Sequence, residues 1–404
     1  MTSQSIFKNR IVLTIMTSSL LLQLGIWIRN FSILLYVTEI TNNNPIYISL
    51  ISVAEFAPIF IFSFIGGTFA DRWKPKLTMI WCDFLSAISI FVVLLSLLFG
   101  SWYSIFFATL VSAILSQFSM PSALKLIKQH IPGEQLQSVM AIFQTLMSIF
   151  MVLGPVIGTF VYQKFGIFIS IGIMGVMFLL SALVLLALPK DQKEKEKTES
   201  RILKEMKDGF MYVMQKPILK SMGIVFAMTG LAVGVIQPLS IFIAIENLGK
   251  SKEFLQWLLM ASGIGMFLGG GAIFALSKKL SPQILLTIGL LASMISVFII
   301  GFSTSIPITL LFQFFNGFFM PCIQIGVNTL ILKNTEESFI GRVNGVLNPM
   351  FMGTMVVGMS ISGIIKIPLT LSGVYLLSGI LFFIGVLLTI PIFKNSVKSV
   401  ESNV

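Results

Sequence analysis

Phe118-Ser119-Met120-Pro121 returns 200 residues later in the chain as Phe318-Phe319-Met320-Pro321. The match continues at the same offset for 40 residues without a gap, a length that chance does not readily produce. A weaker match at an offset of 207 places Glu39 on Glu246. The chain is therefore predicted to consist of two homologous halves. The 200-residue register also pairs Ser138 with Ser338, Gln144 with Asn344 and Gly158 with Gly358.

The composition of the 404 residues indicates a membrane protein. Charged residues make up 11% of the chain and hydrophobic residues 56%, with a mean hydropathy of +0.96. Soluble domains carry about 25% charged residues, so a water-soluble enzyme is excluded. Twelve apolar runs are long enough to cross a bilayer, and the first is interpreted as a retained span and not as a signal peptide. The predicted spans lie near 11–38, 46–70, 77–99, 102–122, 136–163 and 166–188, then near 218–246, 253–277, 282–301, 304–329, 339–365 and 368–393.

Six spans in each half would give the two halves the same orientation in the membrane. The predicted fold is an all-α polytopic membrane protein with twelve transmembrane helices in two parallel six-helix bundles, related by an axis along the membrane normal. The expected domains are an N-terminal bundle at 1–188, a linker at 189–217 and a C-terminal bundle at 218–404. Rocking of one bundle against the other would open a central cavity to each side in turn.

Basic residues fall mainly on one side of this topology. With both termini in the cytoplasm, 22 of the 27 Lys and Arg residues lie in inside segments, four lie outside, and Arg29 lies within a span. This bias is typical of cytoplasmic loops. It accounts for the net charge of +11, so no nucleic-acid partner is expected. We expect a multi-pass protein of a cell membrane that works as a monomer, and its richness in Ile, Lys and Asn is typical of a bacterial source.

The strongly hydrophilic segment between the halves has two parts. Residues 190–197 mix charges of both signs and are expected to be a solvated linker. From Arg201 onward, apolar residues recur at helical spacing, which predicts an amphipathic helix at the cytoplasmic surface. The alternative is a simple tether between two bundles. The apolar positions are Ile202, Leu203, Met206, Phe210, Val213 and Met214.

The chain lacks the residues that most cofactor and metal sites need. Its cysteines, Cys82 and Cys322, both lie in apolar runs, so no disulfide is expected. One histidine, His130, and two scattered thiols cannot form a metal cluster. No glycine-rich phosphate loop is present, so ATP is not expected to drive the protein directly. We therefore expect no cofactor and no enzymatic activity.

Four stretches resemble motifs of the major facilitator superfamily, and the likeness extends over essentially the whole chain. Gly67-Thr68-Phe69-Ala70-Asp71-Arg72-Trp73-Lys74-Pro75-Lys76 is similar to the family's signature between the second and third helices. Gly154-Pro155-Val156-Ile157-Gly158 resembles its antiporter motif. Lys207-Asp208-Gly209-Phe210 and Gly341-Arg342-Val343 are the other two. The resemblance implies a secondary transporter of the drug-efflux branch, similar to macrolide-efflux-type exporters.

Three charged residues lie more than five positions from either end of a predicted span, and thus inside the bilayer: Arg29, Glu55 and Asp83. Such groups cost about 2.5 to 3.5 kcal/mol each and are functional candidates for that reason. Arg29 and Glu55 lie about 12 and 13 Å below the outer ends of adjacent helices, at 1.5 Å per residue. We hypothesise that they pair in one conformation and that Glu55 takes up a proton when the pair opens. The alternative is a permanent ion pair that only fixes helix packing.

Asp83 lies close to the cytoplasmic side, near Asp71 and Arg72. The resemblance implies that Asp71, in a signature that begins at Gly67, faces the start of a helix in the other half. The helix that begins near residue 339, with Arg342 in its first turn, is the natural partner, because a helix N-terminus attracts an anion. We interpret Asp71, Arg72, Asp83 and Arg342 as a cytoplasmic gate. The alternative is that these charges only set the topology.

The antiporter-like stretch holds Gly154 and Gly158 four residues apart on one helix face, with Pro155 between them. Missing side chains allow close approach of another helix, and proline permits a bend. The resemblance adds exchange as the direction of transport. The alternative is an ordinary packing seam of small residues.

The expected cavity is lined mostly by Phe, Met, Leu and Ile, which suits bulky amphiphiles. The favoured function is proton-coupled efflux, by antiport, of hydrophobic or amphiphilic drugs such as macrolide-type antibiotics, with antibiotic resistance as the consequence. The alternatives are a facilitator or symporter for a nutrient, metabolite or lipid-like solute, and a membrane sensor or enzyme that transports nothing. The expected partners are the lipid bilayer, the small-molecule cargo and protons. The candidate polar residues of the cavity are Gln23, Asn30, Gln117, Gln237, Gln313 and Asn316.

Overall fold

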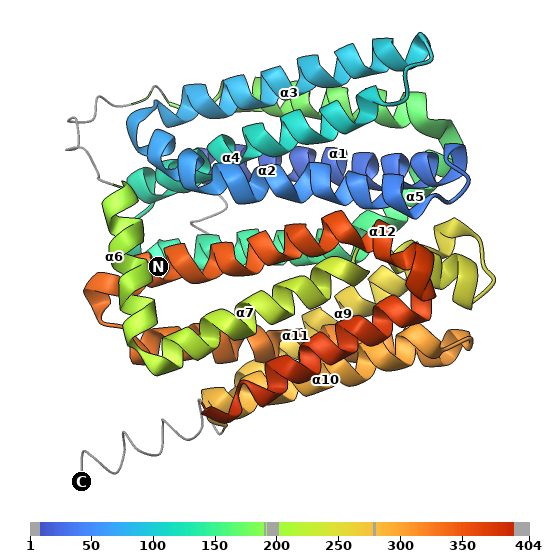
Figure 1. Ribbon diagram of the computed structural model, residues 1–404. Coiled ribbons are helices and arrows are strands. Elements are labelled where there is room, and N and C mark those ends of the chain that lie inside the picture. The colour runs from blue at the N-terminus through green and yellow to red at the C-terminus, as the bar shows by residue number, and fades with distance from the viewer. Residues whose placement is uncertain (1–8, 190, 192–201, 278–279, 392–404) are drawn as a thin grey trace. The chain divides into compact units, whose positions relative to one another are not determined.

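A computed structural model describes residues 9–189, 191, 202–277 and 280–391, and these contain helices and no strands (Figure 1). The side chains of residues 63–72 lie outside the described part. The first helices are α1 (Arg10–Ile40), α2 (Pro45–Arg72), α3 (Pro75–Leu98), α4 (Ser104–His130) and α5 (Gly133–Leu185). They are followed by α6 (Ile202–Gln215), α7 (Pro217–Ile236), α8 (Ser240–Phe242), η2 (Ile243–Asn247), η3 (Lys252–Phe254), α9 (Leu255–Ser277), α10 (Pro282–Phe302), α11 (Ile306–Asn334), η4 (Glu337–Phe339) and α12 (Ile340–Leu387).

Ten of the described helical segments are long and apolar enough to cross a membrane, and two of them, Gln135–Leu185 in α5 and Glu337–Leu387 in η4 and α12, are 51 residues long. A helix of that length measures about 76 Å at 1.5 Å per residue, more than twice the hydrocarbon core of a bilayer. Both long helices break in the middle, α5 at Gly166 with φ 72° and α12 at Thr370 with φ 61°. Each therefore accounts for two spans. The described residues confirm the prediction of an all-α protein with twelve spans.

Proline fixes where several helices begin. Pro75, Pro217 and Pro282 occupy the first turns of α3, α7 and α10, where a missing backbone N–H leaves no hydrogen bond unmade.

The prediction of a single helix over 218–246 is wrong. Helix α7 ends at Ile236, and the chain continues as the short α8 and the π-helical turn η2. Pro238 explains the break, because its ring cannot be accommodated in a continuing helix.

The chain divides into two compact units, residues 1–43 with 50–198 and residues 44–49 with 199–404. The first turn of α2 thus belongs to the second unit, where Ser49 and Ser362 of α12 share a hydrogen bond of 2.8 Å between their hydroxyl oxygens. The absence of a side chain at Gly363 allows this approach, since a Cβ atom there would lie 2.5 Å from the carbonyl oxygen of Pro45.

The two units repeat one packing pattern. In the first unit α1 packs on α5, and α3 packs on α4 and α5. In the second unit α7 packs on α12, and α10 packs on α11 and α12. The 200-residue register holds at one close helix contact in each half: a Cβ atom on Gly158 would lie 2.7 Å from the carbonyl oxygen of Trp27, and one on Gly358 would lie 2.9 Å from that of Leu231. The same pairs of helices therefore meet at the same level in each half.

Candidate functional site

A cavity of about 340 Å³ lies inside the first unit, among α1 to α5. Its walls are largely apolar, but Arg29, Glu55 and Asp83 all line it. The structure thus brings together the three ionisable residues found within spans, from three different helices. The apolar part of the wall includes Leu22, Ile26, Ile59, Met140, Phe143 and Met147.

Arg29 and Glu55 are joined through Asn30. Arg29 is 3% exposed; its Nε donates to the Oδ1 atom of Asn30 at 2.8 Å, and its Nη1 donates to the hydroxyl of Ser112 on α4. The amide nitrogen of Asn30 donates to the Oε1 atom of Glu55 at 2.7 Å. No direct ion pair between Arg29 and Glu55 occurs in the described residues. An uncharged amide, with an acceptor on one side and a donor on the other, connects the two charges.

Asp83 is held at a second place on the cavity wall. Its side chain is buried, with 3% exposure, and its Oδ2 atom accepts a hydrogen bond of 2.6 Å from Ser181 of α5. The hydroxyl of Ser181 lies 2.7 Å from that of Ser18 on α1. Asp83 therefore faces the cavity interior with hydroxyl partners, although its position in the sequence favoured a gating role near the cytoplasmic end.

The charges of the cavity do not cancel when all of its ionisable groups are ionised. The described residues that line the cavity supply one guanidinium and two carboxyl groups, so two ionised carboxylates would leave one net negative charge in apolar surroundings. Burial of an uncompensated charge is costly. The arrangement is therefore suited to take up one proton or one monovalent cation.

The uncharged candidates divide between the two units. Gln23 lines the cavity and its amide donates to the sulfur of Met147 at 2.9 Å. Gln117 is half-buried and donates to Ser116 at 3.0 Å. In the second unit Gln313 and Asn316 are half-buried on α11, and Gln237 is exposed at the end of α7. Of the six candidates, Gln23 lines the cavity itself, and Asn30 and Gln117 are hydrogen-bonded to residues that line it.

The antiporter-like residues lie where α5 meets α1. A Cβ atom on Gly154 would lie 2.3 Å from the indole ring of Trp27, so only glycine permits this contact. Trp27 in turn stacks on Phe31, with ring centroids 6.0 Å apart. Pro155 lies inside the continuous first part of α5. These contacts fit close helix packing, and they leave the proposed bend as a hypothesis.

The gate candidates are distributed over both units. Gly67, Asp71 and Arg72 belong to the last turns of α2, so the signature begins within a helix, and their side chains lie outside the described part. Arg342 lies in the first turn of α12 in the second unit, with its guanidinium 4.8 Å from the ring centroid of Phe339. A Cβ atom on Gly209 would lie 2.7 Å from the carbonyl oxygen of Arg342, which explains the glycine in the Lys207–Phe210 motif.

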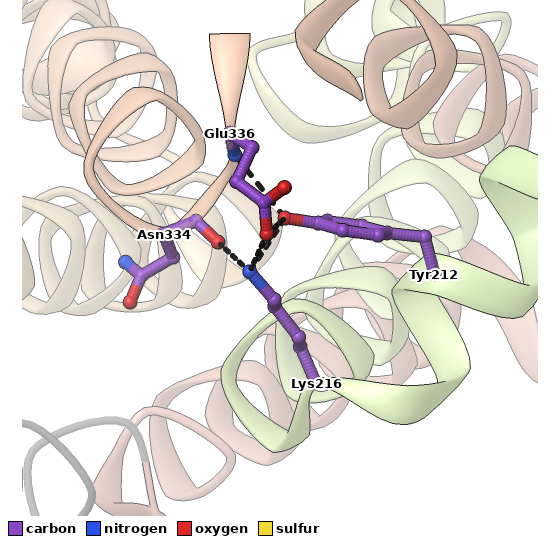
Figure 2. A network of polar contacts seen from close by, with 4 residues as sticks. All are labelled: Tyr212, Lys216, Asn334 and Glu336. Atoms are coloured by element: carbon purple, nitrogen blue, oxygen red, sulfur yellow. Dashed lines mark hydrogen bonds and ion pairs between the residues drawn. The ribbon is translucent and has the colours of Figure 1, made fainter. Parts of the chain in front are cut away.

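A polar network that the sequence analysis missed joins Tyr212 and Lys216 to Asn334 and Glu336, in the segment that leads into α12 (Figure 2). Lys216 donates to the hydroxyl of Tyr212 and to the carbonyl oxygen of Asn334, the latter at 3.4 Å, and forms an ion pair of 3.5 Å with Glu336. The Tyr212 hydroxyl donates to the carboxylate of Glu336 at 3.3 Å and accepts from its backbone N–H at 3.1 Å. The ring of Tyr212 stacks on Phe339 with centroids 4.3 Å apart.

The hydrogen bond with Tyr212 raises the pKa of Lys216. The lysine therefore stays charged through neutral pH, and its contribution to the network is lost only when the pH rises past this raised value. The only sequence signal for the network is a tyrosine and a lysine four apart where α6 meets α7, since Glu336 is 120 residues further on.

Comparisons with known proteins agree with this architecture. A family model described as Major Facilitator Superfamily matches residues 15–234 and again residues 222–403. "Uncharacterized MFS-type transporter YkuC" of Bacillus subtilis is 24% identical over 99% of this chain and 96% of its own length.

Two relatives carry names that state a function. "Multi-drug resistance efflux pump PmrA" of Streptococcus pneumoniae is 26% identical, over 78% of each chain. "Multidrug efflux pump Tap" of Mycolicibacterium fortuitum is 21% identical, over 80% of this chain and 81% of its own length.

Solved structures share the fold at low sequence identity. The nucleoside transporter NupG has a TM-score of 0.76 at 14% identity and covers 96% of this chain and 99% of its own. A bacterial homologue of the human lysosomal transporter Spinster, in an inward-facing conformation, has a TM-score of 0.71 at 13% identity, with 95% of each chain covered.

Proposed function

The chain belongs to the Major Facilitator Superfamily, and we propose that it is a proton-coupled exporter of hydrophobic or amphiphilic compounds. The family makes it a transporter with membrane-spanning helices. Efflux as the direction is supported by the antiporter-like stretch Gly154–Gly158 and by two relatives named as multidrug efflux pumps. Macrolide-type antibiotics are one candidate class of cargo, and drug resistance would be the physiological consequence.

The observation that carries the proposal is the charge composition of the cavity. Arg29, Glu55 and Asp83 share one largely apolar chamber of about 340 Å³, a volume within the range of small-molecule sites. Protonation of one carboxyl group would make the chamber neutral, and its deprotonation would leave one negative charge. Cargo binding and proton binding can compete through this difference.

The hydrogen bonds fit a division of roles between the two acids. Arg29 is fixed by Ser112 and Asn30, so its charge stays in place while the carboxyl groups change protonation. Glu55 is half-buried and contacts one amide of Asn30, which makes it the more accessible acid. We assign Glu55 as the coupling group and Asp83 as the second acid of the chamber. In this exchange the proton binds to and leaves a carboxylate oxygen, the cargo is not chemically changed, and neither a cofactor nor an enzymatic step is needed.

The coupling test uses purified protein in proteoliposomes with an imposed pH gradient and ethidium as the transported dye. Wild-type protein should move the dye when the gradient is applied. Glu55→Gln should abolish gradient-driven transport while the protein stays folded, because glutamine keeps the hydrogen bond and cannot exchange a proton. Glu253→Gln, which changes an acid in η3 outside the cavity, is the control. Undiminished transport by Glu55→Gln would refute the assignment.

Export and import can be separated in cells. If the protein exports amphiphiles, its deletion should raise sensitivity to toxic dyes and to erythromycin, and collapse of the pH gradient should remove the difference. A facilitator or symporter would instead show impaired growth on one nutrient. The second outcome would replace efflux with uptake as the function.

For the cytoplasmic gate we propose that Asp71 and Arg72, near the signature's Gly67, act together with Arg342 at the start of α12. The support is the position of these residues at the last turn of α2 and the first turn of α12, at segments whose basic residues predict the cytoplasmic side. Asp71→Asn should slow transport and leave membrane insertion unchanged. Wild-type transport rates in this variant would exclude the gate.

We further propose a bacterial inner-membrane location with both termini in the cytoplasm and a monomer as the working unit. The positive-inside bias supports this orientation, and the relatives named above come from bacteria. Impermeant labelling of a cysteine introduced at Lys164 should succeed from outside the cell, and at Lys125 only after lysis. The reverse pattern would invert the topology.

A further inference from the structure

The amphipathic helix α6 is attached to the second unit by one side only. Gly209 and Val213 face the bundle: Val213 is 3% exposed, and Gly209 lies against the backbone of Arg342. Tyr212 on the same side stacks on Phe339 of η4. Figure 1 shows α6 lying across the ends of α7 and α12, both of which it contacts.

The other side of α6 is apolar and uncovered. Met206, Phe210, Met211 and Met214 are 37, 51, 50 and 45% exposed. At 100° per residue these four positions fall within an arc of about 140°, and Lys207 lies inside that arc. A helix that buried all its apolar residues in the bundle would not leave four large ones on one side. This side therefore requires a cover other than the described protein.

Chain connectivity places α6 at a bilayer surface. Helix α6 ends at Gln215 and the membrane-spanning α7 begins at Pro217, so one residue separates them. Lys216 and the exposed Lys220 adjoin this junction. A helix with an apolar side and basic residues, lying next to a span, has the features of helices that lie in the headgroup region of a membrane.

We propose that Met206, Phe210, Met211 and Met214, with Lys207 among them, form a docking surface for an anionic phospholipid leaflet. The four apolar side chains enter the boundary between headgroups and acyl chains, and Lys207 binds lipid phosphate groups. Basic residues next to a membrane favour anionic lipids within a Debye length of the surface. The proposal does not depend on which cargo the protein moves or in which direction.

The docking surface would also be connected with the start of α12. Tyr212 and Lys216, on the attached side of α6, hold Glu336 and Phe339 in the segment that leads into α12. A lipid leaflet that fixes α6 thereby fixes this segment, and with it the backbone around Arg342. The content of anionic lipid would in this way influence the mobility of the first turn of α12.

The test places a fluorescent label on each side of α6 in the full-length protein. Met214→Cys lies on the docking surface, and Glu205→Cys is its exposed control on another side of the helix. Both native cysteines are buried and should react slowly. The protein is reconstituted into phosphatidylcholine vesicles with or without phosphatidylglycerol, containing phospholipid with a spin-label quencher at headgroup level. We expect several-fold stronger quenching at position 214 than at position 205, and stronger quenching with phosphatidylglycerol.

Equal quenching at the two positions would overturn the docking surface, and quenching at position 214 that ignores phosphatidylglycerol would overturn the preference for anionic lipid. Phe210→Ser in the Met214→Cys protein should reduce the quenching. Tyr212→Phe, which removes only the hydroxyl, should leave the quenching unchanged and speed hydrogen exchange at Glu337–Phe339. Loss of quenching in Tyr212→Phe would show that the network, and not lipid, orients α6. None of these readouts requires transport, so they stand apart from the test of efflux.

Discussion

The two halves share one packing pattern but differ in the chemistry of their interiors. The first unit buries Arg29 and Asp83 beside the half-buried Glu55, whereas the buried polar side chains described in the second unit are all neutral hydroxyls. At the offset of 207, Arg29 corresponds to Ile236, Glu55 to Ser262 and Asp83 to Leu290. A repeated backbone thus carries the charges in one copy only. Coupling to protons should accordingly be a property of the first half, and the second half should supply the matching moving body.

Charges of the second half lie at its ends instead. Glu246 at the end of the first span pairs with Lys366 at 2.6 Å, and Lys216 pairs with Glu336 at 3.5 Å. The first half keeps the equivalent outer contact in weaker form, since Tyr162 donates to Glu39 at 3.1 Å. Glu39 and Glu246 are the pair that the 207-residue offset aligns. The outer contact made by Glu39 and Glu246 is therefore present in both halves, whereas the charges in the middle are present in the first half only.

The largest loss of folded protein should come from placing a carboxylate inside the second half. Leu290, the counterpart of Asp83, is fully buried. Leu290→Asp would bury an acid without the serine partner that Ser181 provides, and an uncompensated buried charge costs about 3 to 5 kcal/mol. We expect little folded protein, measured as the monodisperse fraction after solubilisation. Leu290→Asn is the control, because asparagine has nearly the shape of aspartate but no charge. Equal yields of the two variants would contradict the conclusion that the second half does not accommodate a buried charge.

Removing the cation of the first half should be the next most damaging change. Arg29→Met leaves Glu55 and Asp83 without a positive neighbour and should lower the free energy of unfolding by about 3 to 5 kcal/mol. Ile236→Met at the matching position should cost less than about 1.5 kcal/mol, since it exchanges apolar groups of similar volume. Thermal unfolding in detergent compares the two. Similar losses would indicate that the halves tolerate change equally.

Adding a methyl group at the helix contact that both halves share should lower the free energy of unfolding by a similar amount in each half. Gly158→Ala and Gly358→Ala each place a methyl group within 3 Å of a backbone oxygen on the neighbouring helix. Each should cost about 1 to 3 kcal/mol through overpacking. Gly172→Ala and Gly345→Ala are matched controls, because no atom beyond the adjacent residues and the local helix backbone lies within 4 Å of the new methyl group. A loss in one half only, measured by thermal unfolding, would break the symmetry of the packing pattern.

The smallest change in stability is expected for variants at the outer ends of the helices. Glu246→Gln removes the ion pair with Lys366, whose ammonium also lies 4.0 Å from the ring centroid of Phe242. The Glu246 side chain is 40% exposed and that of Lys366 is 11% exposed, so the pair should contribute about 1 kcal/mol, the upper end for ion pairs that water screens. Glu39→Gln should cost no more. Both melting temperatures should stay within a few degrees of wild type. A large loss for either variant would mean that the outer contacts stabilise the halves more than the middle does.

The sequence predicted those features that depend on the length of an apolar run and on the depth of a residue within its helix. Apolar runs located the spans, and the counts of residues from the helix ends placed Arg29 and Glu55 at one level. Rotation of each helix about its axis is decided by packing, so the bridging role of Asn30 and the pairing of Asp83 with Ser181, 98 residues away, could not be predicted. The break after Ile236 could have been predicted from Pro238, because proline ends a helix that its neighbours would continue.

Proton release on cargo binding would show whether the cavity couples protons to cargo. Ethidium added to the purified protein in weakly buffered detergent solution, with a pH indicator present, should release about one proton per bound molecule at a pH near the midpoint of the exchange, because linkage between the two ligands is reciprocal. Glu55→Gln should bind the dye without this release. Binding with no change in bound protons at any pH between 5 and 9, in the wild-type protein, would contradict the account.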